Sequence, residues 1–243
     1  MYAVIAHHYW GSPGGGQLVC ASAVIALNKV GLKPILTGTF KFNPAKYVEW
    51  YGIDISRYEV RTLMPINVRA FGLWTRLYVW KPVMDVVSRY DIKAVFIDEE
   101  TYKPLTRFRS SGLKIIEYIH FPFEVVVDPR FRGSGLAYGE DPYIMERYGR
   151  FPMNVYWGVF TRLLPRYLRE NPFNDADLVL TNSRWTAGVA KLVYGEEPIV
   201  LNPPIPPNMS VLGSVRAFEE RGDLVVMLGR FSEEKRYHWV VRE

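Results

Sequence analysis

The first residues of this chain that could do chemistry are glycines in a turn between two apolar segments. Residues 2–6 have the length and character of a strand, and residues 17–30 have the apolar pattern of a helix. Between them the chain carries Gly14, Gly15 and Gly16. Glycines at such a junction let backbone N–H groups approach a phosphate or sugar, and the helix N-terminus adds unpaired donors. The alternative is a glycine loop without a ligand, because the spacing matches neither GxGxxG nor GxxxxGK[ST].

Other polar side chains directly follow strand-like runs. In parallel sheets, ligands bind beyond the carboxyl ends of the strands, so these positions are candidate cleft residues. They are His7 and His8 after residues 2–6, Asp98, Glu99 and Glu100 after residues 92–97, His120 after residues 113–119, and Asn182 and Ser183 after residues 177–181.

Each of these candidates also has a simpler interpretation. His7 and His8 could line an acceptor cleft or be ordinary loop histidines. Glu99 or Glu100 could orient an acceptor hydroxyl, or the acidic run could be a helix N-terminus. Ser183 is more simply the N-cap of a helix that ends at Tyr194.

The elements that must position these residues alternate between strand and helix patterns. This alternation predicts an α/β fold with a Rossmann-like parallel sheet and helices on both faces. The expected strands are residues 2–6, 33–36, 58–63, 92–97, 113–119, 177–181 and 198–201; the expected helices are residues 17–30, 43–50, 71–90, 142–148, 152–170 with an interruption at Pro165, and 184–194.

A proline-rich stretch divides the chain into expected domains. We expect a Rossmann-like first domain over residues 1–202 and a stiff interdomain linker over residues 203–222. Residues 223–243 would supply a strand at 223–228 and the start of a helix, which are too few to bury a core of their own. They are expected either to begin a second domain or to fold back onto the first.

Composition narrows the classes of partner. Of 243 residues, 49% are apolar and 23% charged, which favours a globular chain over long disorder. The net charge of +5 suits anionic partners such as nucleotide phosphates or acidic lipids. Cys20 is the single cysteine, so an intramolecular disulfide and a cysteine-rich metal site are excluded, and we expect it to be a small buried residue. The absence of a signal-like leader predicts a cytoplasmic protein.

Four motifs in order resemble those of family 4 glycosyltransferases. They are Gly14–Gly16, the YIHFP run at 118–122, the TNSRWT run at 181–186 and the GRFSEEK run at 229–235. The family comprises retaining enzymes with two facing Rossmann-like domains, the GT-B fold. The combination is most similar to the branch that includes the mannosyltransferases of lipid-linked oligosaccharide assembly.

The resemblance implies roles for individual residues. The glycine loop would lie under the donor diphosphate and sugar, and His120 would contact the donor hexose. Arg230 and Lys235 would bind the diphosphate and stabilise the leaving nucleotide, so neither a metal nor another cofactor is expected. The family's paired glutamates would lie beyond Glu243, so we expect this chain to lack transfer activity by itself. Trp185 is expected in the core or in interdomain packing.

The expected function is therefore transfer of a hexose, with mannose favoured, from a nucleotide diphosphate sugar to a lipid-linked or glycan acceptor. The alternative is a non-catalytic sugar- or nucleotide-binding module. Basic and aromatic residues over 71–81 and 147–169 suggest an anionic membrane surface as a partner, on the cytoplasmic face, or simply core helices with basic outer faces. Nucleic acid is not an expected partner.

Overall fold

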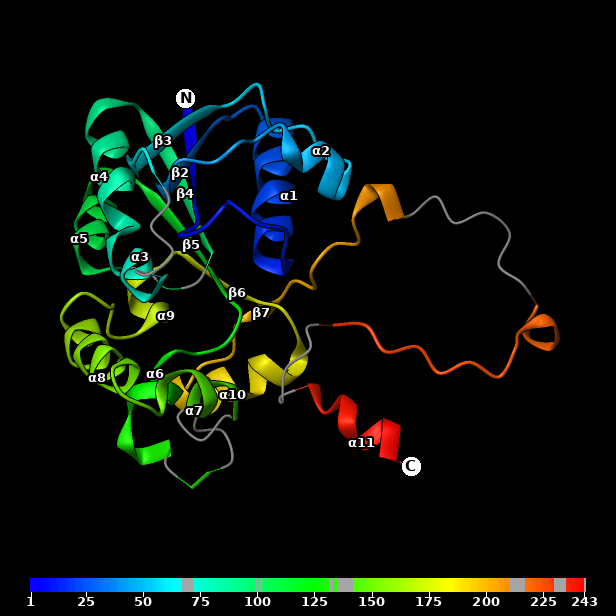
Figure 1. The fold of residues 1–243 in the computed structure, drawn as a ribbon. Helices are drawn as coiled ribbons and strands as arrows, with labels where there is room; N and C mark the ends of the chain where they lie inside the picture. Colours follow the sequence, from blue (N-terminus) through cyan, green and yellow to red (C-terminus); the bar gives the residue numbers. More distant parts are fainter. Residues whose placement is uncertain are drawn as a thin grey trace. The chain divides into compact units, whose positions relative to one another are not determined.

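The computed structural model describes residues 1–66, 72–98, 100, 102–131, 133–134, 142–209, 217–229 and 235–242 (Figure 1). The chain divides into two compact units. The first comprises Met1–Phe123 and Arg162–Ser210, and the second comprises Glu124–Thr161 and Val211–Glu243. The sheet, and the polar residues at the carboxyl ends of its strands, belong to the first unit.

The first unit is built on a seven-stranded sheet with the order β3-β2-β1-β4-β5-β6-β7, in which every neighbouring pair is parallel. The direction of the order reverses between β1 and β4, which is where ligands bind in folds of this kind. The predicted Rossmann-like sheet is confirmed. The strands are β1 (Tyr2–Ala6), β2 (Lys33–Phe40), β3 (Glu59–Met64), β4 (Ile92–Asp98), β5 (Lys114–Ile119), β6 (Leu178–Thr181) and β7 (Ile199–Val200).

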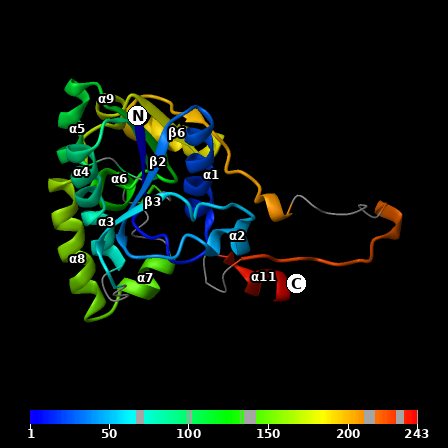
Figure 2. The same ribbon diagram turned by 90° about the horizontal axis from the view of Figure 1, so that it is seen from above.

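Helices cover both faces of this sheet, with α1 on one side and α4 on the other (Figure 2). The helices of the first unit are α1 (Gly15–Lys29), α2 (Lys46–Tyr51), α3 (Gly72–Tyr78), α4 (Trp80–Arg89), α5 (Lys103–Thr106), α9 (Pro172–Asp175) and α10 (Arg184–Tyr194). The second unit contains α6 (Glu124–Val127), α7 (Pro142–Tyr148) and α11 (Tyr237–Arg242), and α8 (Met153–Leu163) runs from the second unit into the first. Among the described helices, none is both long and apolar enough to cross a bilayer.

The core forms where α1 packs on the centre of the sheet. Val4 and Ile5 of β1 are completely buried, and so are Cys20 and Val24 of α1. The expectation that Cys20 is a small buried residue is therefore confirmed. A central parallel strand is covered on both faces, which explains why β1 consists of apolar residues without alternation.

Prolines end two of the expected helices early. The segment 71–90 divides at Val79 into α3 and α4, because Pro82 lies in the first turn of α4 and has no N–H to bond the carbonyl of Tyr78. The break near Pro165 is confirmed, but the continuation to residue 170 is wrong: α8 ends at Leu163, a short 3₁₀ turn over Leu164–Arg166 follows, and residues 167–170 are not helical.

The strand expected over residues 223–228 is wrong. These residues form no strand, and Leu228 is 92% exposed. A strand needs a neighbour to pair its backbone N–H and C=O groups, and the described residues supply none here.

Asn208 connects the proline-rich segment to α2. Its side-chain amide donates to the carbonyls of Glu49 and Trp50, at 3.3 Å each. These carbonyls belong to the last turn of α2, whose C-cap Gly52 has a left-handed conformation. A residue far along the chain thus satisfies the end of a six-residue helix that is too short to be stable alone.

A buried ion pair joins β5 to the segment after α8. The guanidinium Nε of Arg169 donates to both carboxylate oxygens of Glu117, at 2.8 and 3.1 Å, and both side chains are 0% exposed. Arg169 therefore does not belong to the basic outer face over 147–169 that the sequence suggested.

Glu117→Ala should lower the free energy of unfolding by about 3–5 kcal/mol, because it leaves the Arg169 guanidinium buried without its carboxylate. Urea denaturation measures this loss. As a control, Glu197→Ala breaks the exposed pair with Lys191 and should cost no more than about 1 kcal/mol. Similar losses for the two variants would contradict the assignment.

Candidate functional site

The candidate site is centred on Asp98, whose carboxylate lies between two histidines. Asp98 is the last residue of β4 and its side chain is 0% exposed. One carboxylate oxygen, Oδ1, lies 2.5 Å from Nε2 of His120, and the other, Oδ2, lies 2.7 Å from Nδ1 of His7. His7 follows β1 and His120 follows β5, the two strands that flank β4. The parallel sheet therefore brings all three residues to one edge.

Gly16 in the first turn of α1 makes room for this cluster. A Cβ atom at Gly16 would lie 2.8 Å from Oδ2 of Asp98 and 3.2 Å from Cε1 of His7. A Cβ at Gly15 would contact nothing within 4 Å, and one at Gly14 would meet the flexible side chain of Gln17. Of the three predicted glycines, Gly16 is the one whose missing side chain the buried cluster requires.

The N-terminus of α1 lies beside the same carboxylate. Gly14 is the N-cap, and no side chain caps the helix. The N–H groups of Gly15, Gly16 and Gln17 occupy the first turn, where helical geometry provides no backbone acceptor. They carry the positive end of the helix dipole, which favours an anion at this position.

The electrostatics of Asp98 follow from its two partners. Burial by itself raises the pKa of this carboxyl, but His120 and His7 outweigh that effect and hold the pKa below its ordinary value. Asp98 is therefore ionised at neutral pH. The contact with His7 is short but not aligned as a hydrogen bond, and within the described ranges Nε2 of His7 has no hydrogen-bond partner although the residue is only 3% exposed.

Asn182 and His8 also lie at the site. The side-chain amide of Asn182 donates to the carbonyl of His120 at 2.9 Å and so supports the loop that carries this histidine. His8 is half-buried, and its ring centroid lies 4.8 Å from that of His7. Ser183 is the N-cap of α10 and accepts from the N–H of Thr186, so the simpler interpretation of Ser183 is confirmed.

Two of the predicted residues, Glu99 and Arg230, lie outside the described residues. Lys235 belongs to the second unit, where its side chain is exposed. Of the two places expected for Trp185, the core is wrong, because Trp185 is 63% exposed and stacks on Phe121 with ring centroids 5.8 Å apart; interdomain packing stays a prediction. Residue 185 is the second residue of α10, at the edge of the unit rather than under the sheet.

The sequence placed Asp98 among the candidate cleft residues but gave it no role, because orientation of an acceptor hydroxyl was assigned to Glu99 or Glu100. The expected strand ended at Ile97, whereas β4 includes Asp98, which pairs with Tyr118 of β5. The position of Asp98 in the sequence could have indicated its importance. It is the first polar residue after the apolar run 94–97, at the carboxyl end of the strand.

His7, Cys20 and Asp98 also form a mixed set of possible metal ligands, with donor atoms within 4.8 Å of one another. A tetrahedral Zn²⁺ with bonds of roughly 2.0–2.1 Å would keep the ligand atoms of His7 and Asp98 about 3.3 Å apart. The observed separation of 2.7 Å is too short for two ligands of one such ion. That transfer needs no metal stays a prediction.

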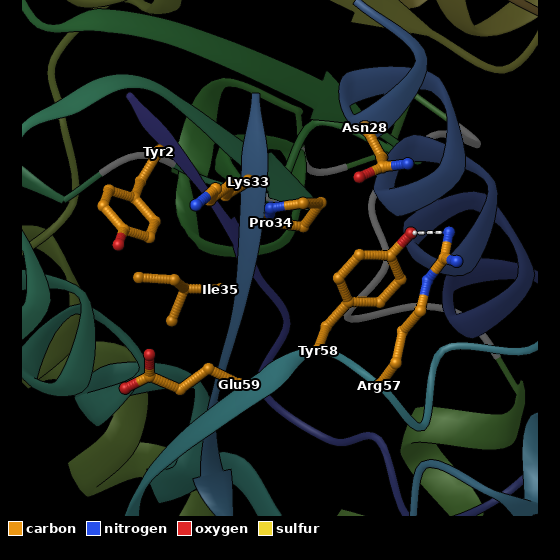
Figure 3. Close-up of a pocket in the computed structure, with 8 residues that line it drawn as sticks. All are labelled: Tyr2, Asn28, Lys33, Pro34, Ile35, Arg57, Tyr58 and Glu59. Atoms are coloured by element: carbon orange, nitrogen blue, oxygen red, sulfur yellow. Dashed lines mark hydrogen bonds between the residues drawn. The ribbon is translucent and has the colours of Figure 1, made fainter. Parts of the chain in front are cut away.

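A separate cavity of about 220 Å³ lies at the opposite edge of the sheet (Figure 3). Tyr2, Lys33 and Glu59, which begin β1, β2 and β3, line it together with Arg57 and Tyr58. Because these residues lie at the amino ends of the strands, this cavity is not part of the site around Asp98.

No protein-family model matches the sequence, and no curated protein matches it. Among solved structures, the chain is similar to Os79 from O. sativa in complex with UDP, with 12% identity and a TM-score of 0.42 over 81% of this chain and 50% of that one. A complex of Os79 with UDP and deoxynivalenol-3-glucoside gives 14% identity and a TM-score of 0.44, over 90% and 56% of the two chains.

A ugt transferase from Siraitia grosvenorii in complex with UDP gives 10% identity and a TM-score of 0.38, over 83% and 50% of the two chains. This chain thus spans about half the length of the structures it resembles. At these identities and TM-scores the likeness carries no argument about function, so any function proposed for this chain depends on its own residues.

Gly16→Ala should lower the free energy of unfolding by about 1–3 kcal/mol, because the new Cβ would overlap the buried carboxylate of Asp98. Gly15→Ala is the matched control: its Cβ meets open space, and alanine costs less backbone entropy in a helix, so stability should stay constant or rise by up to about 1 kcal/mol. Chemical denaturation of both variants measures the difference. Equal stabilities of the two variants would show that no close approach exists at Gly16.

Asp98→Asn should destabilise the protein most at neutral pH. Because the folded-state pKa of Asp98 is depressed, the ionised carboxylate contributes stability above its ordinary pKa of about 4. That contribution disappears as the pH falls below this value, so the stability difference between the parent and the variant should shrink there.

Denaturation curves from pH 7 to pH 3 measure this difference. Asp85→Asn, which breaks an exposed pair with Arg89, should change stability by less than about 1 kcal/mol at every pH. A difference for Asp98→Asn that stays constant with pH would contradict the ionised state of Asp98.

Proposed function

We propose that this chain serves in a glycosyltransferase that moves a hexosyl group from a nucleoside diphosphate sugar to an acceptor hydroxyl. The observation that carries this proposal is the buried Asp98 carboxylate between His7 and His120, beside the N-terminus of α1. This arrangement combines a proton acceptor with a place for an anion at the carboxyl edge of a parallel sheet.

His120 is the residue suited to proton transfer. Its Nε2 faces Asp98, and its side chain is 30% exposed, so the ring reaches both the buried carboxylate and the surface of the unit. A proton on Nε2 shared with the carboxylate makes Nδ1 the basic nitrogen and stabilises the imidazolium that forms on proton uptake. Nδ1 of His120 would then accept the proton of the acceptor hydroxyl as the glycosidic bond forms.

The N-terminus of α1 suits the leaving group. Breaking the bond between sugar and phosphate develops negative charge on the diphosphate, and fixed N–H donors stabilise this charge without any proton transfer. The donors are the N–H groups of Gly15, Gly16 and Gln17, which have no side-chain cap. Arg230 and Lys235, from the family-like GRFSEEK run, are proposed as additional cations for the diphosphate.

The donor sugar, the acceptor and the stereochemistry are proposed from the sequence motifs that resemble those of family 4 glycosyltransferases. We propose mannose as the donor sugar, a lipid-linked or glycan acceptor, and retention of the anomeric configuration, as in family 4 glycosyltransferases. The anionic membrane surface belongs to this part of the proposal. A base such as His120 also suits a single displacement, which inverts the configuration, so the product anomer is the decisive observation.

The experiment is an assay of sugar transfer by the full-length protein. GDP-mannose and UDP-glucose serve as probe donors, a panel of glycans serves as acceptors, and release of the nucleoside diphosphate is followed. Proton NMR of the product identifies the anomer. Because both donors are α-linked, an α-linked product supports retention. A β-linked product would overturn retention and show that the configuration is inverted. Binding of a nucleoside diphosphate without any transfer or hydrolysis would favour the non-catalytic binding module instead.

His120→Ala should lower kcat by about 10²–10⁴-fold, because the acceptor hydroxyl loses its proton acceptor. Asp98→Asn should lower kcat as well, and the double variant should be little worse than His120→Ala alone, because the two side chains act as one unit. Multiplicative losses would show independent roles. Thermal denaturation of the same variants serves as the control: a loss of kcat that only follows a loss of stability would assign His120 a purely structural role.

A further inference from the structure

The hydroxyl of Tyr51 holds the glycine-rich loop at the start of α1. Tyr51 is the last residue of α2 and is 5% exposed. Its hydroxyl accepts from the N–H of Gly14 at 2.6 Å and donates to the carbonyl of Gly14 at 2.9 Å. Both polar backbone groups of the N-cap residue are therefore bound by one side-chain atom, contributed from 37 residues away.

The conformation of Gly14 explains how one hydroxyl can bind both its N–H and its C=O group. Gly14 is fully extended, with φ −178° and ψ 171°. In a fully extended residue the N–H and the C=O point in the same direction, so a single oxygen can accept from one and donate to the other. The carbonyl of Gly14 also accepts from the N–H of Leu18 at 3.1 Å, which begins α1. Tyr51 thereby fixes the residue from which the helix starts.

A second tyrosine of α2 holds the other end of the loop. The hydroxyl of Tyr47 donates to the carbonyl of Trp10 at 3.0 Å, and Nε1 of Trp10 donates to the carbonyl of Thr37 in β2 at 2.9 Å. Tyr47 and Tyr51 lie one helical turn apart, with ring centroids separated by 5.5 Å. Burial raises the pKa of both hydroxyls, so both keep the proton that they donate. The loop between Trp10 and Gly14 is thus held at both ends by one short helix.

We infer that Tyr51 is a positioning residue: by holding Gly14, it directs the N–H groups of Gly15 and Gly16 toward the anionic diphosphate of the donor. This inference rests on the proposed function. Tyr51 itself need not contact the donor, because its hydroxyl is occupied by Gly14 on both the donor and the acceptor side. Without the hydroxyl, the N-cap would lose its partner and the first turn of α1 would start in more than one direction.

Tyr51→Phe tests the inference, because phenylalanine keeps the ring contacts and removes only the hydroxyl. Isothermal titration with UDP, GDP and ADP should show roughly a 2- to 10-fold rise in Kd for the nucleotide that the parent protein binds. The backbone amide resonances of Gly15 and Gly16 should shift in the variant without any ligand. Tyr58→Phe is the matched control: it removes a hydroxyl that accepts from Arg57 at the opposite edge, and should change neither Kd nor these resonances.

The two readouts separate the inference from the proposed function. If the parent protein binds none of the three nucleotides, the proposed function fails, and the amide resonances still decide whether Tyr51 positions the loop. If those resonances are unchanged in Tyr51→Phe, or if stability falls while Kd stays constant, the positioning role is overturned. Tyr47→Phe provides a second variant, which should shift the same resonances from the other end of the loop.

Discussion

The site depends on one constraint: the carboxylate of Asp98 is charged and has no contact with water. Taking such a group out of water is expensive unless nearby donors and positive charge replace the solvent. Here His120 supplies a hydrogen-bonding partner, the His7 ring lies in short contact with the other carboxylate oxygen, and the first turn of α1 brings the positive end of a helix dipole. The order of strands β1, β4 and β5 is what allows the three groups to meet, and Gly16 is what allows the helix to approach.

Aromatic residues of the first unit hold the loop that follows β1 and so support the site around Asp98. Trp10 stacks on Phe42 with ring centroids 5.1 Å apart and is almost completely buried, so the loop after β1 is anchored in the core rather than exposed. Gly38 of β2 leaves space for the indole, since a Cβ there would lie 2.8 Å from Cδ1 of Trp10. In this region the aromatic side chains hold a loop in place.

Much of the fold follows from local pattern, and much of the site does not. The alternation of apolar strand patterns with helix patterns was sufficient to predict the parallel sheet. Because the carboxyl ends of parallel strands meet at one edge, it was also possible to predict that His7 and His120 lie at the same edge. The choice of Asp98 over Glu99 depended on β4 being one residue longer than expected, which local pattern does not determine. The partnership of Tyr51 with Gly14 joins residues 37 positions apart, and only the folded chain brings them together. The missing strand at residues 223–228 shows the converse, because an apolar pattern without a pairing partner does not make a sheet.

The bond from Asn208 to the end of α2 has a consequence for the order in which the protein acquires its shape during synthesis. Residues 2–51 leave the ribosome before Asn208 does, and they contain both the glycine-rich loop and its tyrosines. The helix that carries those tyrosines is completed by an amide that lies 159 residues after Glu49. Closing so long a loop is slow compared with forming local contacts. The end of α2 therefore acquires this cap only after the proline-rich segment has been made and has folded back onto the helix.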